Sequence, residues 1–109
     1  MRDEFGRFDG MFIITTFDIM ESPDTSSMQK RLRKLTKVLK GFGKRVQKSV
    51  FECYLDNPQI EIMRDRISKI IETDLGDNVR FYKLCNSCYE KIEVLGERGV
   101  SEEDELYIL

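Results

Sequence analysis

The segment Met11–Met20, MFIITTFDIM, limits the fold of this chain more than any other. Its residues from 12 to 17 are all aromatic or β-branched, which is typical of a strand. A run this short fits a strand buried on both faces better than a helix, because a helix needs more residues. One carboxylate, Asp18, follows this run, and a charge there must be hydrated, paired, hydrogen-bonded or bound to a cation. We therefore expect a central strand, with Asp18 as the first candidate functional residue.

Basic residues are concentrated in the segment that follows. Between residues 25 and 51 there are nine Lys and Arg and no Asp or Glu, although the net charge of the chain is −2. They are Lys30, Arg31, Arg33, Lys34, Lys37, Lys40, Lys44, Arg45 and Lys48. Solvated faces normally mix the two signs of charge, so this block favours a phosphate-binding surface over a face that only keeps a helix hydrated. We expect Lys34, Lys37 and Lys48 to contact nucleic acid.

Apolar residues within the basic block follow a helical period. Spacings of 4, 3, 4 and 3 residues place them on one face, and they are Met28, Leu32, Leu35, Leu39 and Phe42. Most of the basic side chains then fall on the opposite face, with Arg31 at its flank. Gly41 predicts the end of the helix, and its start is left open between Pro23 and Ser26.

The rest of the chain predicts alternating strands and a second helix. Residues 45–55 are strand-like, either as two short strands or as one kinked strand with a break somewhere within 44–56. Asn57 and Pro58 predict the cap and the first position of a helix that ends before Gly76. Further strands are expected at 79–84 and 91–95.

This order of elements predicts an α+β fold, a ferredoxin-like βαββαβ sandwich with an extra C-terminal strand. Two helices would cover one face of an antiparallel sheet. The other face needs a second subunit or a ligand to cover it. The domain spans residues 11–96, between a leader at 1–10 and an acidic tail at 97–109. The tail ends in an apolar tetrapeptide that either binds a partner or packs on its own domain.

Composition excludes several classes of protein. There is no His, which excludes Ser–His and Cys–His catalysis within one chain and leaves carboxylates and a metal for any hydrolysis. No run approaches the roughly 20 apolar residues that span a bilayer, so we expect no membrane partner. The first ten residues lack the apolar core of a secretion signal, and the Cys count of 3 is odd. Both features predict a cytoplasmic protein with reduced thiols.

Cys85 and Cys88 form a single CxxC pair. Zinc takes four ligands, so one chain supplies at most half of a site. Reduced thiols without a special role are the favoured interpretation. Two others stay open, namely a metal site joined from two pairs in a dimer, and a redox pair, which needs a lowered thiol pKa at a helix start.

Four motifs give the chain a resemblance to the CRISPR-associated Cas-two family. They are Phe17-Asp18-Ile19 after the first strand, Phe42-Gly43 after the basic helix, Arg45-Val46-Gln47-Lys48-Ser49-Val50-Phe51-Glu52, and Val79-Arg80-Phe81-Tyr82 together with Lys91-Ile92-Glu93-Val94-Leu95-Gly96. The third is the most specific, and the resemblance covers residues 11–96.

The resemblance implies a homodimer of ferredoxin-like protomers in which the late strand adds to the partner's sheet. It also implies spacer acquisition with the Cas-one integrase on duplex DNA, with Arg31, Arg33 and Arg45 as phosphate contacts. Some members are described as metal-dependent nucleases on RNA or duplex DNA, which implies that Asp18 is a catalytic metal ligand. Mg²⁺ usually takes one or two carboxylates beside water and phosphate, so two copies of Asp18 across a two-fold axis would complete such a site.

Three functions follow, in order of preference: a scaffold for duplex DNA, a stand-alone Mg²⁺-dependent endonuclease, and a metal carrier through the Cys pair. In the scaffold, Asp18 is either a vestigial ligand or a cap for the turn at Ile19 and Met20. Four other acids could assist at a metal, and their spacing selects none of them; they are Glu21, Asp24, Glu52 and Asp56.

Overall fold

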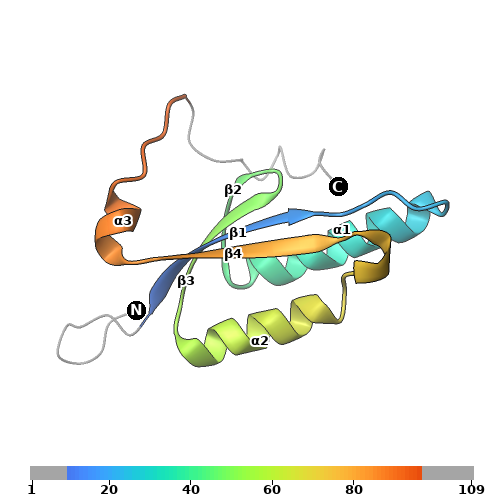
Figure 1. Cartoon of the computed structure of the whole chain (residues 1–109), viewed down its shortest axis with the longest axis horizontal. Coiled ribbons are helices and arrows are strands. Elements are labelled where there is room, and N and C mark those ends of the chain that lie inside the picture. The colour runs from blue at the N-terminus through green and yellow to red at the C-terminus, as the bar shows by residue number, and fades with distance from the viewer. Residues whose placement is uncertain (1–9, 97–109) are drawn as a thin grey trace.

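The computed structural model describes residues 10–96 as one sheet with its two long helices on one side (Figure 1). In chain order the elements are β1 (Met11–Asp18), α1 (Thr25–Lys40), β2 (Gly43–Gln47), β3 (Val50–Leu55), α2 (Asn57–Ser68), the 3₁₀-helix η1 (Thr73–Leu75), β4 (Asn78–Leu84) and α3 (Asn86–Glu90). The predicted leader and tail lie outside these residues, apart from Gly10. Between residues 10 and 96, none of the helices is both long and apolar enough to cross a bilayer.

The sheet has the strand order β2-β3-β1-β4, and all three pairings are antiparallel. β1 therefore lies in the centre, as its composition predicts. Paired residues share a face of the sheet. Ile13 lies opposite Cys53, and Thr15 lies between Phe51 and Phe81. This register turns one side of β1 and β3 toward α1 and α2, and the ferredoxin-like fold class is confirmed.

The core lies between the sheet and the two long helices. Its buried apolar side chains are Ile13, Phe17, Leu35, Leu39, Phe51, Cys53, Leu55, Ile60, Met63 and Ile67. They follow a helical period along α1 and α2 and a period of two along β3, as the sequence predicts, and also along β1, which in the single chain is buried on one face and not on both as expected. Burying one large aliphatic or aromatic side chain contributes about 1.5–3 kcal/mol, so this layer supplies most of the driving force for folding.

The break in the 45–55 segment lies at Lys48 and Ser49, which form the turn between β2 and β3. Two short strands are therefore the correct alternative. The Arg45 side chain closes the turn, because its Nε and Nη2 donate to the Lys48 carbonyl at 3.1 and 2.6 Å. At the start of β2, Gly43 is required by packing, since an added Cβ would lie 2.5 Å from the Glu52 carbonyl oxygen.

Both long helices begin at a cap other than the one that the sequence predicts. Asp24 caps α1 by accepting from the Ser26 backbone at 3.0 Å, between the two starts left open by the sequence. Asp56, rather than Asn57, caps α2, and Gln59 completes a reciprocal capping box. Neighbouring Asp, Asn and Ser residues are nearly equivalent caps, so composition alone does not choose among them. α2 also ends earlier than predicted, at Ser68.

The expected strand at 91–95 is wrong for the single chain. Residues 86–90 form the short helix α3, and the backbone N–H groups of Lys91 and Ile92 continue it by donating to Cys88 and Tyr89. Within the described part of the chain the sheet has only four strands. A strand needs an open edge to pair with, and residues 92–95 instead line a hollow over β2 and β3.

Candidate functional site

Asp18 is the last residue of β1, and it is exposed. It lies opposite Asn78 of β4. Its neighbour Phe17 is buried on the helix side of the sheet, so Asp18 belongs to the opposite face. Among residues 10–96, no hydrogen bond or ion pair reaches its carboxylate. It does not cap the turn at Met20, because the Met20 N–H donates to Asp77 instead. The structure thus leaves the Asp18 carboxylate open to solvent.

The acids considered as helpers for a metal are mostly engaged elsewhere. Asp24 and Asp56 cap helices, and Glu52 accepts a hydrogen bond from the Tyr89 hydroxyl at 3.1 Å. No group of three or more Cys, Asp or Glu within residues 10–96 is arranged to hold a metal. Asp18 alone meets the minimum for Mg²⁺, which takes few protein ligands and relies on water and phosphate oxygens. No such group forms around Asp18 within residues 10–96, and a metal site there stays a prediction.

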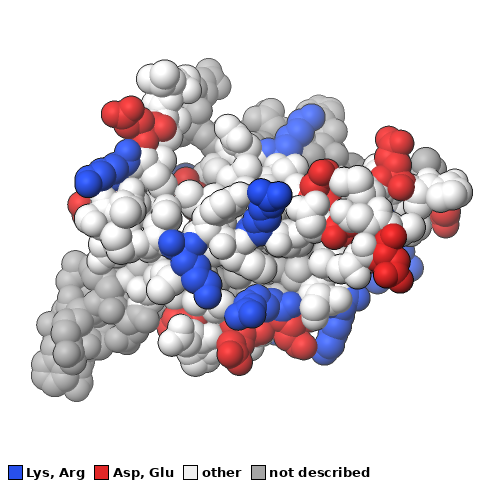
Figure 2. All heavy atoms as spheres, viewed as in Figure 1, with Lys and Arg blue, Asp and Glu red and all other residues white. Residues whose placement is uncertain are grey.

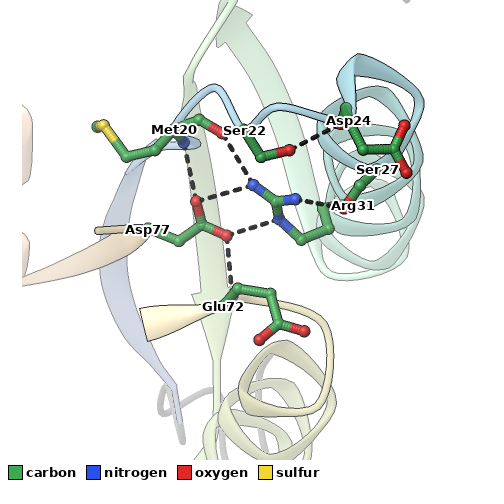
Figure 3. A network of polar contacts seen from close by, with 7 residues as sticks. All are labelled: Met20, Ser22, Asp24, Ser27, Arg31, Glu72 and Asp77. Atoms are coloured by element: carbon green, nitrogen blue, oxygen red, sulfur yellow. Dashed lines mark hydrogen bonds and ion pairs between the residues drawn. The ribbon is translucent and has the colours of Figure 1, made fainter. Parts of the chain in front are cut away.

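Two residues after Asp18, the chain is held by a buried network that we call the Arg31–Asp77 clamp (Figure 3). Nε of Arg31 donates to Oδ2 of Asp77 at 2.9 Å, and Nη2 donates to the Met20 carbonyl at 2.8 Å. The remaining nitrogen, Nη1, donates to the Ser27 hydroxyl at 2.8 Å. Arg31 is only 6% exposed. All its nitrogens face protein acceptors, so the structure does not favour the predicted phosphate contact at Arg31.

Asp77 is the central acceptor of the clamp. Its Oδ1 accepts from the Met20 N–H at 2.8 Å, and its Oδ2 accepts from the Glu72 N–H at 2.9 Å. Burial raises the pKa of the Asp77 carboxyl, but the hydrogen bonds from Arg31, Glu72 and Met20 outweigh burial and lower the pKa below its ordinary value. The clamp thus joins α1, the loop after β1 and the segment after α2.

Sequence reasoning missed Asp77. Its only signal is a position directly after Gly76, a turn glycine with φ of 97°. An acid in that place is common on a protein surface. Its partner lies 46 residues earlier, in the block of nine bases. Nothing in the spacing selects Arg31 from those bases.

The outer side of α1 carries the exposed bases. They are Lys30, Arg33, Lys34, Lys37 and Lys40. The same orientation buries Leu35 and Leu39 against the sheet. Arg33, Lys34 and Lys37 are therefore accessible, as a phosphate contact requires, and Lys48 is exposed in the β2–β3 turn. Nucleic-acid contact by these residues stays a prediction.

Arg45 differs from these bases, because it is 4% exposed. Its guanidinium binds the Lys48 carbonyl and lies 5.7 Å from the centre of the Phe51 ring. This geometry favours a cation–π contact within the domain. The structure therefore does not favour the predicted phosphate contact at Arg45. Arg45 shapes the turn that presents Lys48.

Acidic side chains gather at the end of the molecule that carries Asp18. Figure 2 shows Lys and Arg across the middle of one face, and several Asp and Glu at the right, where Figure 1 has the β1–α1 loop and η1. Exposed acids of this region are Asp18, Glu21, Asp24, Glu72 and Asp74. A local excess of negative charge attracts cations and opposes phosphate. The Asp18 end and the outer face of α1 therefore suit different partners.

Comparison with known proteins identifies the family. The family model described as CRISPR associated protein Cas2 matches residues 11–92. A relative from Chloroflexus aurantiacus, named CRISPR-associated endoribonuclease Cas2 1, is 37% identical over 100 residues, which are 91% of this chain and 100% of the relative. A relative from Halalkalibacterium halodurans, named CRISPR-associated endonuclease Cas2, is 36% identical over 88% of this chain and 98% of its own length.

Solved structures agree with this assignment. The crystal structure of Streptococcus pyogenes Cas2 at pH 6.5 is similar with a TM-score of 0.68 and 34% sequence identity. The similarity covers 79% of this chain and 100% of that one. Fold and sequence therefore lead to the same conclusion, that the chain belongs to the CRISPR-associated Cas2 family.

Proposed function

We propose that this Cas2 family member is a homodimeric subunit for spacer acquisition, which holds duplex DNA beside the Cas-one integrase through phosphate contacts. The observation that carries this proposal is the exposed outer side of α1. It presents five bases, and α1 contains no acid over its 16 residues. Neutralising phosphates releases counterions from DNA, so such a row gives affinity without reading sequence. A scaffold needs binding of this kind.

The open face of the sheet supports the homodimer. Tyr82 of β4 is 46% exposed, and beyond α3 the apolar residues Ile92, Val94 and Leu95 are exposed as well. Residues 92–95 and the β2–β3 hairpin border a hollow of about 570 Å³. A small domain gains stability by covering an apolar surface of this kind. A second copy presents the same surface, which gives the self-complementary contact of a two-fold dimer.

Magnesium-dependent nuclease activity is the second candidate. The names of the relatives, endoribonuclease and endonuclease, favour it, and Asp18 is exposed at an acidic end of the molecule. In a dimer that brings two copies of Asp18 together, the pair would hold Mg²⁺ with water and phosphate oxygens. When bound, the ion would orient and activate a water for attack on RNA or duplex DNA. Asp18 would act only as its ligand.

Replacing three bases of the α1 face tests the scaffold. The variant Arg33→Gln, Lys34→Gln, Lys37→Gln should bind duplex DNA more weakly, because each lost phosphate contact removes counterion release. Each contact contributes about 0.9 to the slope of log affinity against log salt concentration, so the slope should flatten by up to about 3. Filter binding over a series of salt concentrations measures both quantities.

A matched variant removes the same charge elsewhere. Arg64→Gln, Lys69→Gln, Lys83→Gln changes exposed bases of α2, its end and β4. This control should keep the affinity and the slope of the wild type. Equal losses in both triple variants would show that net charge alone matters, and would contradict a binding face on α1.

Asp18→Asn separates the two candidates. If the protein is a scaffold, the variant should support integration of labelled duplex by the Cas-one integrase at the wild-type rate, because the amide keeps the shape of the exposed side chain. If it is a nuclease, the variant should lose cleavage of the same duplex and of RNA in Mg²⁺. Loss of integration by a variant that still folds and dimerises would contradict a scaffold that does not use Asp18.

A further inference from the structure

The short helix α3 begins at a pair of exposed thiols. Cys85 is its N-terminal cap, and Cys88 lies one turn later. The Cys85 sulfur lies 3.2 Å from the Ser87 hydroxyl, and both thiols are exposed. The N-cap residue and the third residue of a helix lie on the same side of its first turn, so the fold places Cys88 beside Cys85. Residues three apart on a helix are close enough for a disulfide after a small adjustment.

The two thiols differ in protonation. The Ser87 hydroxyl, followed by the N–H and thiol of Cys88, lowers the pKa of Cys85 to about 7. Interaction with Cys85 raises the pKa of Cys88. At neutral pH, a substantial fraction of Cys85 is thus thiolate, beside a neighbour that keeps its proton. This is the arrangement of an attacking thiol and a resolving thiol.

We propose that Cys85 and Cys88 form a redox-active pair that closes a disulfide across the first turn of α3 when a low-molecular-weight disulfide oxidises it. The Cys85 thiolate attacks one sulfur of the oxidant, so that a mixed disulfide forms and one thiolate leaves. Cys88 then gives its proton to solvent and attacks the Cys85 sulfur, and the second thiolate leaves. The pair loses two electrons, and the oxidant is reduced to two thiols.

The disulfide would act on the open face of the sheet through Tyr89. The Tyr89 N–H donates to the Cys85 carbonyl at 3.0 Å. Its ring stacks on Phe12 of β1, with centroids 3.8 Å apart and an angle of 5° between planes. Its hydroxyl donates to Glu52 of β3. A disulfide across the first turn of α3 restrains the Cys85 carbonyl that binds the Tyr89 N–H. Oxidation should therefore stabilise α3 with Tyr89 against β1 and β3.

Cys53 is the internal control. It is 3% exposed in β3, and burial raises its pKa. Reduced full-length protein is incubated with oxidised glutathione, alkylated under denaturing conditions and weighed intact. Of the three cysteines, only Cys53 should remain to be alkylated, and the protein should have lost two hydrogen atoms. Three alkylated cysteines after equilibration would overturn the proposal.

Single variants assign the roles of the two thiols. Cys88→Ser should accumulate one glutathione adduct at Cys85, because no second thiol resolves it. Cys85→Ser, which keeps only Cys88, should react with oxidised glutathione about fivefold more slowly than Cys88→Ser at pH 7. The larger thiolate fraction of Cys85 outweighs the lower nucleophilicity of its thiolate. Equal rates in the two variants would contradict an attacking Cys85.

Two further measurements test the effect on α3 and the absence of zinc at the two thiols. Hydrogen exchange of the Tyr89 amide should slow on oxidation, and unchanged exchange would overturn the effect on α3. Metal analysis of the purified protein should find no zinc bound to the pair. Zinc that blocks both thiols and leaves with a chelator would overturn the redox role in favour of a metal site shared between two copies.

Discussion

Arg31 and Arg33 lie two residues apart on α1, and their surroundings are opposite. Arg31 is 6% exposed and donates to Asp77, Met20 and Ser27. Arg33 is exposed beside Lys34 and Lys37. A helix turns about 100° per residue, so two positions move a side chain from the rim of the core to solvent. Equal charges on one helix therefore have different tasks, one in stability and the other in recognition.

The difference follows from desolvation. Taking a charge out of water costs several kcal/mol unless a partner and hydrogen bonds compensate it. The clamp provides them, because Arg31 has an acceptor for each nitrogen and Asp77 accepts two backbone N–H groups besides Arg31. An exposed base needs no such partner and stays available for phosphate. The clamp and the outer face can therefore be tested independently.

Removing the central acceptor should have the largest effect on stability. Asp77→Ala leaves Arg31 buried without its counter-charge and two backbone N–H groups without their acceptor. We expect a loss of about 3–5 kcal/mol in the free energy of unfolding, measured by urea denaturation. Asp74→Ala removes an exposed acid three residues earlier and should stay within about 0.5 kcal/mol of the wild type. Equal losses in the two variants would contradict a specific stabilising role of the buried clamp.

A smaller loss is expected for Arg31→Lys. The ammonium keeps the charge near Asp77, but it cannot reach Met20, Ser27 and Asp77 together, as the planar guanidinium does. Losing charge-assisted hydrogen bonds should cost about 1.5–3 kcal/mol in the free energy of unfolding. Thermal denaturation followed by circular dichroism measures it. A stability equal to that of the wild type would mean that charge alone matters at this position.

A feature of this contrast could be predicted only where the residues that determine it lie close together in the sequence. The helical period of Leu32, Leu35 and Leu39 is local and correctly predicted α1 with an exposed basic side. The β-prone run of β1 and the alternation in residues 45–55 are local too, and they predicted β1, β2 and β3. The fate of Arg31 depends on Asp77, which reaches it only after α2 and η1 have folded back. Counting charges along the sequence cannot distinguish a base that pairs with an acid far away in the sequence from a base that stays exposed.

The same reasoning explains the other differences. Arg45 belongs to the most specific motif of the sequence analysis, but its burial depends on the turn at Lys48 that it closes itself. Residues 91–95 have the composition of a strand, yet in the single chain they pair with neither outer strand of the sheet, β2 or β4. Exposure of Asp18 was compatible with every role considered for it. The structure excludes a cap at Met20 and leaves the others to experiment.

Acid should weaken the clamp gradually. The pKa of Asp77 is lowered from an ordinary value of 3.8, so the folded state holds its proton less tightly than the unfolded chain. Its contribution to stability is complete above 3.8 and is lost as the pH falls through the lower pKa of the folded state. The stability gap between the wild type and Asp77→Ala should therefore narrow below pH 3.8, as urea denaturation at several pH values would measure. A constant gap would contradict the lowered pKa.

The smallest effect is expected for Arg33→Lys, the counterpart of Arg31→Lys. An exposed base without a fixed acceptor loses no geometry when its charge is kept, so the free energy of unfolding should change by less than about 0.5 kcal/mol. Duplex affinity and its salt dependence should also persist, because counterion release depends on charge and not on a planar fork. Filter binding and urea denaturation of the two Lys variants, run side by side, complete the comparison. If Arg33→Lys weakened binding by tenfold or more, Arg33 would make a bidentate contact to one phosphate, and the outer face would be a shaped site rather than a row of charges.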